Sequence, residues 1–373
     1  MKIPTPKNLK SMDAQPAFAL LSVMALTLSI QARAADSAAA ATTGSSRTKL
    51  TDYTQLKLGE NSSAKFNALL QGWSVANQTV TAKDQNFRLR RAELKLSGLV
   101  AGVVKPVFMV DPAKLIPAPG GKAVAADQMI QDLALTAVVA PGLELTAGQM
   151  KIPAMAEALD SSGELPLPER SLIARTLGDK REIGAKVAYK TSAFNASAML
   201  SSARNITQGV ENFASDVIAR VEATPVSGTS AGVFGIIGGA TGGGSFDYAK
   251  KGRVGLNART TLGALQLRGE GALARDTLKD KGVDSSGWTL EAGYFVTPDL
   301  LPVVRVEGYT PNLAGSQIAT AETVGVSYFF RDAYAKVQLA GSALQNLAAT
   351  NGTSAYVAGA VNQEITLAVQ SSI

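Results

Sequence analysis

Charged side chains stand at every second position in many short stretches of this chain, with apolar residues between them. Residues 91–96 read Arg-Ala-Glu-Leu-Lys-Leu, and residues 304–307 read Val-Arg-Val-Glu. A face that carries bases and acids together can attract and sort ions in water, which is the chemistry that this spacing offers. The chain contains no His and no Cys. An imidazole base, a Ser-His-Asp triad and a Cys/His zinc site are therefore excluded, and we expect no enzyme, no cofactor and no metal site.

The elements that carry these residues are β-strands, because a period of two places all apolar members on one face. In a soluble sandwich that face would meet a second sheet, whereas in an outer-membrane barrel it would meet lipid and the polar face would line a lumen. Apolar faces of Ala, Val and Leu, with aromatic residues at only 6% and charges of both signs at mid-strand, favour the barrel. Membrane strands need about nine to eleven residues each, so the sequence predicts an all-β fold, a transmembrane antiparallel β-barrel of about sixteen strands.

The N-terminal residues have the pattern of an export signal. Three lysines precede an apolar run over residues 17–30, which is too short to span a bilayer as a helix, and a small-x-small cleavage site follows at residues 32–34. Half of the net charge of +6 lies in this leader, so nucleic acid is not an expected partner. We expect a cleaved signal peptide over residues 1–34, a flexible spacer over 35–63 and a barrel of the bacterial outer membrane over 64–373.

One connection is much longer than the others and runs from about Ile152 to Lys180. It contains three prolines and a short helix-like stretch from Ala154 to Leu159. A long loop with local structure of its own is usually functional. Inside a barrel it has room to fold inward and narrow the lumen, and we predict such a constriction loop; an outward surface loop is the alternative.

Five stretches, in order along the chain, resemble motifs of the bacterial phosphate-selective porin O and P family. They are Phe87-Arg-Leu-Arg-Arg-Ala-Glu-Leu-Lys-Leu-Ser-Gly98, Gly148-Gln-Met-Lys-Ile-Pro153, Pro168-Glu-Arg-Ser171, Arg181-Glu-Ile-Gly184, and Gly293-Tyr-Phe-Val-Thr-Pro298 with Val304-Arg-Val306 after it. The resemblance implies a sixteen-stranded, trimeric diffusion pore whose loop after the fifth strand folds inward. It also implies that Arg170 and Arg181 flank the constriction and that Arg91 and Arg305 line the wall.

Three residues depart from the family pattern. Glu93 stands where the family's strand has a third base, and Ile373 stands where a terminal aromatic residue is usual. Pro106 falls inside the apparent third strand, where a proline cannot donate to the ladder, so we expect it to mark a bulge or a strand boundary. Four aromatic residues near strand ends are expected in interfacial girdles: Trp73, Tyr309, Tyr328 and Phe329.

Two groups of residues form the candidate site. The pore-constriction group comes from the long loop and its two ends: Lys151, Glu169, Arg170, Arg175, Lys180 and Arg181. The pore-lining group comes from strand positions of lumen parity: Arg91, Lys95, Lys186, Arg220, Arg268, Arg305 and Lys336. Acids at lumen parity are at least as numerous as bases, so the sequence shows no basic funnel.

The first functional hypothesis is a porin, a water-filled channel for passive diffusion of small hydrophilic solutes and ions. A preference for anions or phosphate is the second, since phosphate binding needs several converging donors and the charge count does not show them. The alternative is a soluble periplasmic or surface β-rich binding or structural protein without channel activity. The expected partners of the porin are outer-membrane lipid, small ions and solutes, phosphate under the second hypothesis, and further copies of the chain in a homotrimer.

Overall fold

The structure is a computed structural model that describes residues 55–79, 83–116, 129–203, 216–239, 248–278, 281–330, 335–350 and 353–372. The predicted signal peptide, most of the predicted spacer and Ile373 lie outside these residues. Among the described residues, no helix is long and apolar enough to cross a membrane.

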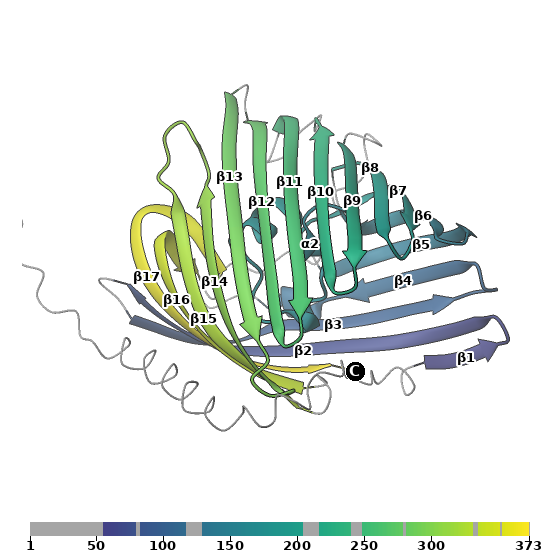
Figure 1. Ribbon diagram of the computed structural model, residues 1–373, viewed down its shortest axis with the longest axis horizontal. Coiled ribbons are helices and arrows are strands. Elements are labelled where there is room, and N and C mark those ends of the chain that lie inside the picture. The colour runs from purple at the N-terminus through teal and green to yellow at the C-terminus, as the bar shows by residue number, and fades with distance from the viewer. Residues whose placement is uncertain are drawn as a thin grey trace, which may run out of the picture. The chain divides into compact units, whose positions relative to one another are not determined.

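Strands dominate the described part of the chain and join in one antiparallel sheet (Figure 1). They are β1 (Gln55–Gly59), β2 (Ser62–Thr79), β3 (Lys83–Leu99), β4 (Val104–Val110), β5 (Ile130–Ala140), β6 (Leu143–Lys151), β7 (Arg181–Lys190), β8 (Phe194–Ser201), β9 (Asp216–Val226), β10 (Thr229–Gly238), β11 (Tyr248–Leu262), β12 (Leu265–Leu278), β13 (Lys281–Tyr294), β14 (Leu300–Thr310), β15 (Ala319–Phe330), β16 (Ala335–Thr350) and β17 (Thr353–Ser372). Each strand from β2 onward pairs with the next, and β17 pairs back onto β2, from Asn362 opposite Thr79 to Ser372 opposite Leu69. The ring β2–β17 is the closed sixteen-stranded barrel that the alternation predicts.

The short strand β1 lies outside this ring and was not predicted. It pairs with residues 62–65 of β2, on the edge opposite β3. This is the edge that β17 occupies only from Leu69 onward. Without β1 the start of β2 would expose unpaired backbone groups beside the membrane, which is costly. Residues 55–63 are therefore strand and turn rather than part of a flexible spacer.

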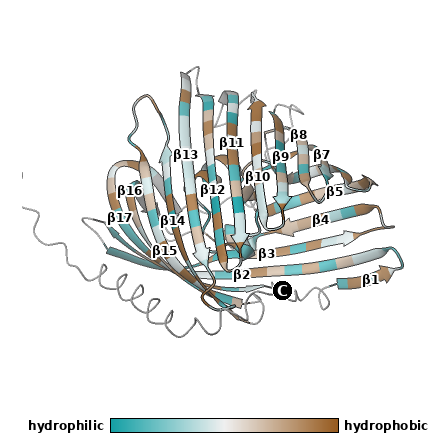
Figure 2. Cartoon of the chain, viewed as in Figure 1, coloured by the Kyte–Doolittle hydropathy of each residue, from teal (hydrophilic) through white to brown (hydrophobic). Residues whose placement is uncertain are grey.

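The two faces of the ring differ in polarity, as the alternation predicts. Val217 and Val221 of β9 have exposed fractions of 51% and 49%, whereas Asp216 and Arg220 on the other face are 0% and 5% exposed. Figure 2 shows the same alternation of hydrophobic and hydrophilic residues along the strands. An apolar outer face around a closed ring is suited to lipid, because closure leaves no unpaired strand edge.

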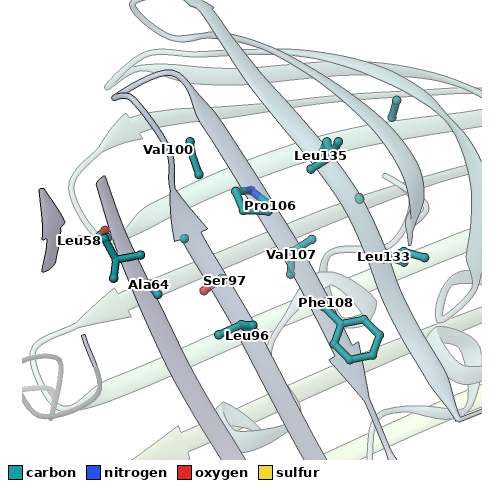
Figure 3. Close-up of a pocket in the computed structure, with 14 residues that line it drawn as sticks. Leu58, Ala64, Leu96, Ser97, Val100, Pro106, Val107, Phe108, Leu133 and Leu135 are labelled. Carbon is teal, nitrogen blue, oxygen red and sulfur yellow. The ribbon is translucent and has the colours of Figure 1, made fainter. Parts of the chain in front are cut away.

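Pro106 lies inside β4, and the ladder to β3 ends beside it. The pairing of β3 with β4 runs only from Leu94 opposite Val110 to Ser97 opposite Val107. The missing amide hydrogen of Pro106 explains why the ladder to β3 stops there. The strand itself continues, with Pro106 opposite Leu135 of β5, so the prediction that Pro106 marks a bulge or a strand boundary is wrong. On the outer wall at this point lies an apolar hollow of about 530 Å³, lined by Pro106 together with residues such as Leu96 and Leu135 (Figure 3).

Two glycines of the family-like motifs allow a close approach of strands at the base of the long loop. Gly148 of β6 has a φ of 126° and stands opposite Gly184 of β7. A Cβ atom at Gly148 would lie 2.2 Å from the carbonyl oxygen of Leu133, and one at Gly184 would lie 2.2 Å from that of Leu200. A side chain fits at neither position unless the backbone moves.

We expect Gly148→Ala to lower the free energy of unfolding by about 2 kcal/mol, since strained backbone and overpacking each cost about 1–3 kcal/mol. The measurement is urea unfolding of the refolded protein in detergent micelles, followed by tryptophan fluorescence. Gly315→Ala is the control, because no atom lies within 4 Å of its added Cβ. Equal stability of the two variants would contradict the prediction.

Candidate functional site

The long loop, residues 152–180, joins β6 to β7 and lies inside the ring, as predicted. It contains three short helical turns, α2 (Ala156–Leu159), η5 (Ser162–Glu164) and η6 (Ala174–Gly178). Most of its side chains are buried, and they contact the inner faces of strands far away in sequence. The strand β6 is the fifth of the ring β2–β17, so the position of the loop also agrees with the family resemblance.

Three apolar contacts hold the long loop against the inner wall. Ile152, Met155, Ile173 and Leu177 pack with Met199, Ile218, Phe234 and Ile236 of β8 to β10. Leu167 packs with Leu301, Val303, Phe329 and Ala340 of β14 to β16. Leu172 packs with Ala319, Ala321, Leu344 and Leu347 of β15 and β16. The inward faces of these strands are therefore apolar where the loop covers them, instead of being polar throughout.

Cationic side chains of the wall hold carbonyl groups of the long loop. The Nη1 atom of Arg220 donates to the carbonyl oxygen of Ala154 at 2.6 Å. On the other side of the lumen, Lys336 Nζ donates to the carbonyl oxygen of Leu165 at 2.7 Å. Both wall side chains are nearly fully buried. These two cationic groups thus provide hydrogen-bond donors for backbone carbonyl groups of the long loop that are not paired in regular secondary structure.

Carboxylates of the wall hold the amide groups at the starts of two helical turns. Glu270 Oε1 accepts hydrogen bonds from the backbone N–H groups of Ala156 at 2.6 Å and Glu157 at 3.1 Å. Glu307 Oε2 accepts one from the N–H of Leu172. A carboxylate at a helix start satisfies free amides and complements the helix dipole. Helical turns this short are not stable alone, so the wall is what orders them.

Ion pairs connect the same wall to the long loop through two arginines. Arg268 Nη2 lies 3.2 Å from Glu157 Oε1, and Arg268 Nε lies 2.8 Å from Glu291 Oε1. Arg305 Nε lies 3.4 Å from Glu307 Oε1. Burial alone would raise the pKa of Glu157, but the charges of Arg268 and Arg305 lower it. Glu157 is therefore ionised at neutral pH and binds the loop to β12 and β14.

A β-bulge in β3 turns two consecutive arginines toward the lumen. Gln71 of β2 stands opposite Arg91 and the next residue stands opposite Leu89, so Arg90 has no partner in the ladder. Arg90 and Arg91 both pair with Glu169 of the long loop, the latter with Nη2 2.9 Å from Oε1. Burial would raise the pKa of Glu169, but these two guanidinium groups hold it well below its usual range.

Trp73 lies beneath this cluster and not in an interfacial girdle as predicted. It is 1% exposed, and the guanidinium carbons of Arg88 and Arg90 lie 5.1 and 5.2 Å from its ring centroid. Phe329 is likewise buried on the inner side, against Leu167. The sequence predicts both at the interface only because they lie near strand ends. In the structure their side chains point to the inner side of the barrel, so that prediction is wrong for both.

The predicted constriction residues fall into two kinds of surroundings. Arg170 is buried and donates to the carbonyl oxygens of Glu157 and Asp160, so it holds the long loop together. Lys151 donates to the carbonyl oxygens of Ala158 and Asp160, and Arg175 Nε to that of Arg170. Lys180 is exposed, and Arg181 Nε lies 2.8 Å from Asp132 Oδ1. Of the six predicted constriction residues, Lys180 alone is exposed, and Arg181 is half-buried at the start of β7.

The predicted pore-lining residues divide in the same way. Four of them lie at the contact between wall and long loop: Arg220, Arg305 and Lys336, which are buried, and Arg268, which is half-buried. Arg91 is buried beside Glu169. The other two, Lys95 and Lys186, are half-buried and make no ion pair with any described residue. Strict alternation did not predict Arg88 and Arg90 as inward residues. Basic residues at both even and odd positions over residues 88–91 are the pattern that a β-bulge would leave in the sequence.

Lysines without counter-ions face the part of the lumen that the long loop leaves open. Lys65 of β2, Lys95 of β3 and Lys186 of β7 are half-buried, and within the described part of the chain none of them has an ion-pair partner. Three acids on the same wall are paired: Glu93 with Arg91 at 3.8 Å, Asp132 with Arg181 at 2.8 Å and Glu144 with Lys105 at 2.5 Å. Two more acids, Asp111 and Glu182, are buried and accept hydrogen bonds from Ala92 N and Ser201 Oγ. Three unpaired lysines therefore stand against two unpaired acids on this side of the lumen, an excess of one positive charge.

A closed sixteen-stranded ring with an apolar outer face, a charged lumen and a long internal loop defines a channel-forming outer-membrane porin. The model of the family described as phosphate-selective porin O and P matches residues 71–235, which include the long loop. This part of the chain is therefore similar to that family. No curated protein sequence matches it.

Solved structures of outer-membrane proteins share the fold at low sequence identity. The anion-selective porin from Comamonas acidovorans has a TM-score of 0.64 and 13% identity, over 84% of this chain and 100% of that one. OmpT of Vibrio cholerae has a TM-score of 0.61 and 12% identity, over 86% and 100%. The channel DcaP of Acinetobacter baumannii has a TM-score of 0.59 and 10% identity, over 85% and 99%.

Proposed function

We propose that this porin passes small hydrophilic solutes by passive diffusion and prefers anions. The observation that carries the preference is the set of three lysines without counter-ions, Lys65, Lys95 and Lys186, on the open side of the lumen. A pore selects charge by the sign of its lining groups, and low-dielectric walls strengthen their field. The anion selectivity that the Comamonas acidovorans porin carries in its description supports the same direction.

Arg88 adds to the positive potential near the long loop. No described carboxylate forms an ion pair with it, and its Nε and Nη2 atoms have no hydrogen-bond partner among the described residues. It stacks on Trp73 instead. The carboxylates of Glu169 and Glu364 act on its charge through space without an ion pair, unlike the direct pairing of Arg90 and Arg91 with Glu169.

The test is the zero-current potential of the refolded protein in a planar bilayer under a KCl gradient. We expect the wild type to favour chloride. Each of Lys65→Gln, Lys95→Gln and Lys186→Gln should lower the chloride-to-potassium permeability ratio about twofold, since a unit charge in water at about 8 Å contributes about 0.5 kcal/mol. The triple variant should approach no preference.

Lys83→Gln is the control, because Lys83 is exposed at the start of β3 and stands opposite Gln78 on the outward face of the barrel. It should leave the permeability ratio unchanged. A wild type without chloride preference would leave a general diffusion pore and contradict the anion proposal. Added phosphate provides the finer test, since a phosphate preference requires that low phosphate blocks the chloride current.

We also propose that the leader is cleaved after Ala34 and that the porin assembles as a homotrimer in contact with outer-membrane lipid. The export pattern of residues 1–34 and the apolar outer face support this. OmpT of Vibrio cholerae has been solved in a trimer form. Mass determination of the mature N-terminus and chemical cross-linking in outer-membrane fragments test the two parts separately.

A further inference from the structure

We infer that the outer end of the β16–β17 hairpin is a clamp that holds the long loop against β14 and β15, and that Asn346 positions this clamp. The clamp comprises residues 346–350 of β16 and 353–360 of β17. It is not needed to close the ring, because β16 and β17 are already paired up to Gln345 and Val361. The clamp concerns the position of the long loop, so it does not depend on the proposed anion preference.

The clamp lies at the end of the barrel that carries the long connections. The connections from β6 to β7, from β14 to β15 and from β16 to β17 leave the same end, because each strand of the ring is antiparallel to its neighbours. Turns at the other end are short, such as residues 141–142, 227–228 and 263–264. Outer-membrane barrels have short periplasmic turns and longer extracellular loops, so the clamp is on the extracellular side.

A break in the ladder bends the hairpin where the clamp begins. The pairs run regularly to Gln345 opposite Val361 and resume with Leu347 opposite Tyr356. One residue of β16 therefore stands against four residues of β17 in the gap. Extra residues on one strand bend and twist a hairpin. Figure 1 shows the two strands curving over at this end.

Asn346 is the single residue of β16 in this gap, and its side chain fixes the bend. Its φ of 53° is in the left-handed region, which Asn adopts more readily than most residues. Its Nδ2 atom donates to the carbonyl oxygen of Ile318, just before β15, at 2.8 Å. Its Oδ1 atom accepts a hydrogen bond from the N–H of Gly359 on β17 at 2.7 Å. One amide side chain thus connects the bend to the strands on both sides of β16.

The bend brings apolar side chains of the clamp onto the long loop. Leu347 lies beyond the end of β15, since Gln345 already pairs with Thr320, the second residue of that strand. A straight hairpin would leave Leu347 in water, yet it is 0% exposed. Together with Tyr356 it belongs to the apolar cluster that contains Leu172 of the long loop.

Leu172 is therefore held from two sides. The carboxylate of Glu307 on the wall accepts a hydrogen bond from its backbone N–H, and its buried side chain lies in the cluster that the clamp completes. Thr176 Oγ1 donates to the carbonyl oxygen of Leu172 at 2.7 Å, so the turn η6 is connected to the same point. An apolar side chain is more stable away from water, so the clamp favours the position of the loop against β14 and β15.

The chain contains no Cys, so single introduced cysteines report which parts of the long loop become accessible. Leu172→Cys lies in the cluster under the clamp. Leu177→Cys is the matched control, because Leu177 is equally buried in the same loop but belongs to the cluster on β8–β10. Asn346→Gly keeps the left-handed backbone and removes both side-chain hydrogen bonds. We expect it to raise the rate at which a methanethiosulfonate reagent modifies Leu172→Cys about tenfold and to leave Leu177→Cys unchanged.

Single-channel recording gives the second readout, because brief closures report movement of the long loop. Asn346→Gly should raise the frequency of closures about tenfold. Asn346→Asp should have a smaller effect, since Asp still accepts from the N–H of Gly359 and lacks only the donor to Ile318. Asn312→Gly is the control: it removes a side-chain hydrogen bond, from Ala314 N at 3.0 Å, in the neighbouring connection without touching the clamp. It should record like the wild type.

Heat-modifiable migration on a gel identifies the folded fraction of every variant. If Leu172→Cys does not fold, Leu347→Cys on the clamp itself replaces it. Faster modification of Leu172→Cys alone, together with more closures, is the expected result. Equal acceleration at Leu172→Cys and Leu177→Cys, or acceleration at neither, would overturn the positioning role of Asn346. Faster modification of Leu172→Cys with an unchanged current would show that the long loop stays in place without the clamp, which would overturn the clamp itself.

Discussion

Replacing Glu169 by Gln is expected to detach the middle of the long loop from β3 and to lower the free energy of unfolding by about 3–5 kcal/mol, the usual cost of breaking a buried ion pair. Glu169 is the single carboxylate that pairs with both Arg90 and Arg91. Its loss leaves two inward guanidinium groups side by side, Arg90 without a counter-charge and Arg91 with only the longer contact to Glu93, whose Oε1 lies 3.8 Å from Arg91 Nε. The conductance should become noisy as the loop fluctuates, and the preference for chloride should increase.

Glu164→Gln is the matched control for this variant. Glu164 lies in the same loop and the change in charge is the same, but its side chain is exposed and no described residue forms an ion pair with it. Urea unfolding in lipid vesicles and single-channel recording of both variants make the comparison. Similar stability and similar noise in the two would show that Glu169 does not hold the loop.

The pH dependence of the unfolding free energies of the wild type and Glu169→Gln gives a second test. The pKa of Glu169 is lowered in the folded protein, so its stabilising contribution is complete above the pKa of an unfolded Glu, about 4.3. It is lost as the pH falls through the lower, folded value. The stability difference between wild type and Glu169→Gln should therefore be constant from pH 8 to about pH 5 and should shrink only in more acidic solution.

The ring could be predicted from the sequence because membrane strands obey a simple rule. Lipid on one side and water on the other impose a period of two, and Val217 and Arg220 show it as clearly as any pair. The long loop could be recognised from its length and its prolines. Its inward direction was a prediction from the resemblance and from available space, and the inner-wall contacts of Leu167 and Leu172 bear it out.

The arrangement of charges inside the ring could not be predicted in the same way. The alternation of residues along a strand predicts which side chains face inward, but not whether water or the long loop covers them. Lys186 and Lys336 are therefore indistinguishable in the sequence. Only contacts across the lumen separate them, as with Lys336 and the carbonyl oxygen of Leu165. The bulge at Arg90 has the same consequence, because one inserted residue reverses the parity of everything before it.

Replacing Arg305 by Met is expected to weaken the contact between the long loop and β14 by about 3–5 kcal/mol, because Glu307 loses its counter-charge and Glu157 and Glu291 keep only Arg268. Arg305 is 7% exposed. Its Nη1 atom donates to the carbonyl oxygen of Glu169 at 2.8 Å and lies 3.8 Å from Glu157 Oε1 and 3.9 Å from Glu291 Oε2. Met has a similar length, so the loss is one of charge and hydrogen bonding more than of volume.

Acidification should reduce this loss. Without Arg305 the pKa of Glu157 rises from its lowered value, since one of the two cations that lower it is gone. Arg268 still lowers this pKa, so the stabilising contribution of Glu157 is complete above the pKa of an unfolded Glu, about 4.3, and is lost only in acid. The stability difference between wild type and Arg305→Met should therefore be constant above about pH 5 and shrink in more acidic solution.

Arg275→Met is the control, because Arg275 also pairs with an acid, Asp284, with Nε 2.6 Å from Oδ1, but is 76% exposed. An exposed ion pair contributes little, so this variant should unfold like the wild type.

The double variant Arg305→Met, Glu307→Gln tests the mechanism. Removing the carboxylate charge that has lost its partner should recover part of the lost stability, because Gln can still accept the hydrogen bond from Leu172 N. If Arg305→Met unfolded like Arg275→Met, the apolar contacts would be sufficient to keep the long loop on the wall. The ion pairs around Glu157 would then affect the electrostatic potential of the lumen and not the stability of the protein.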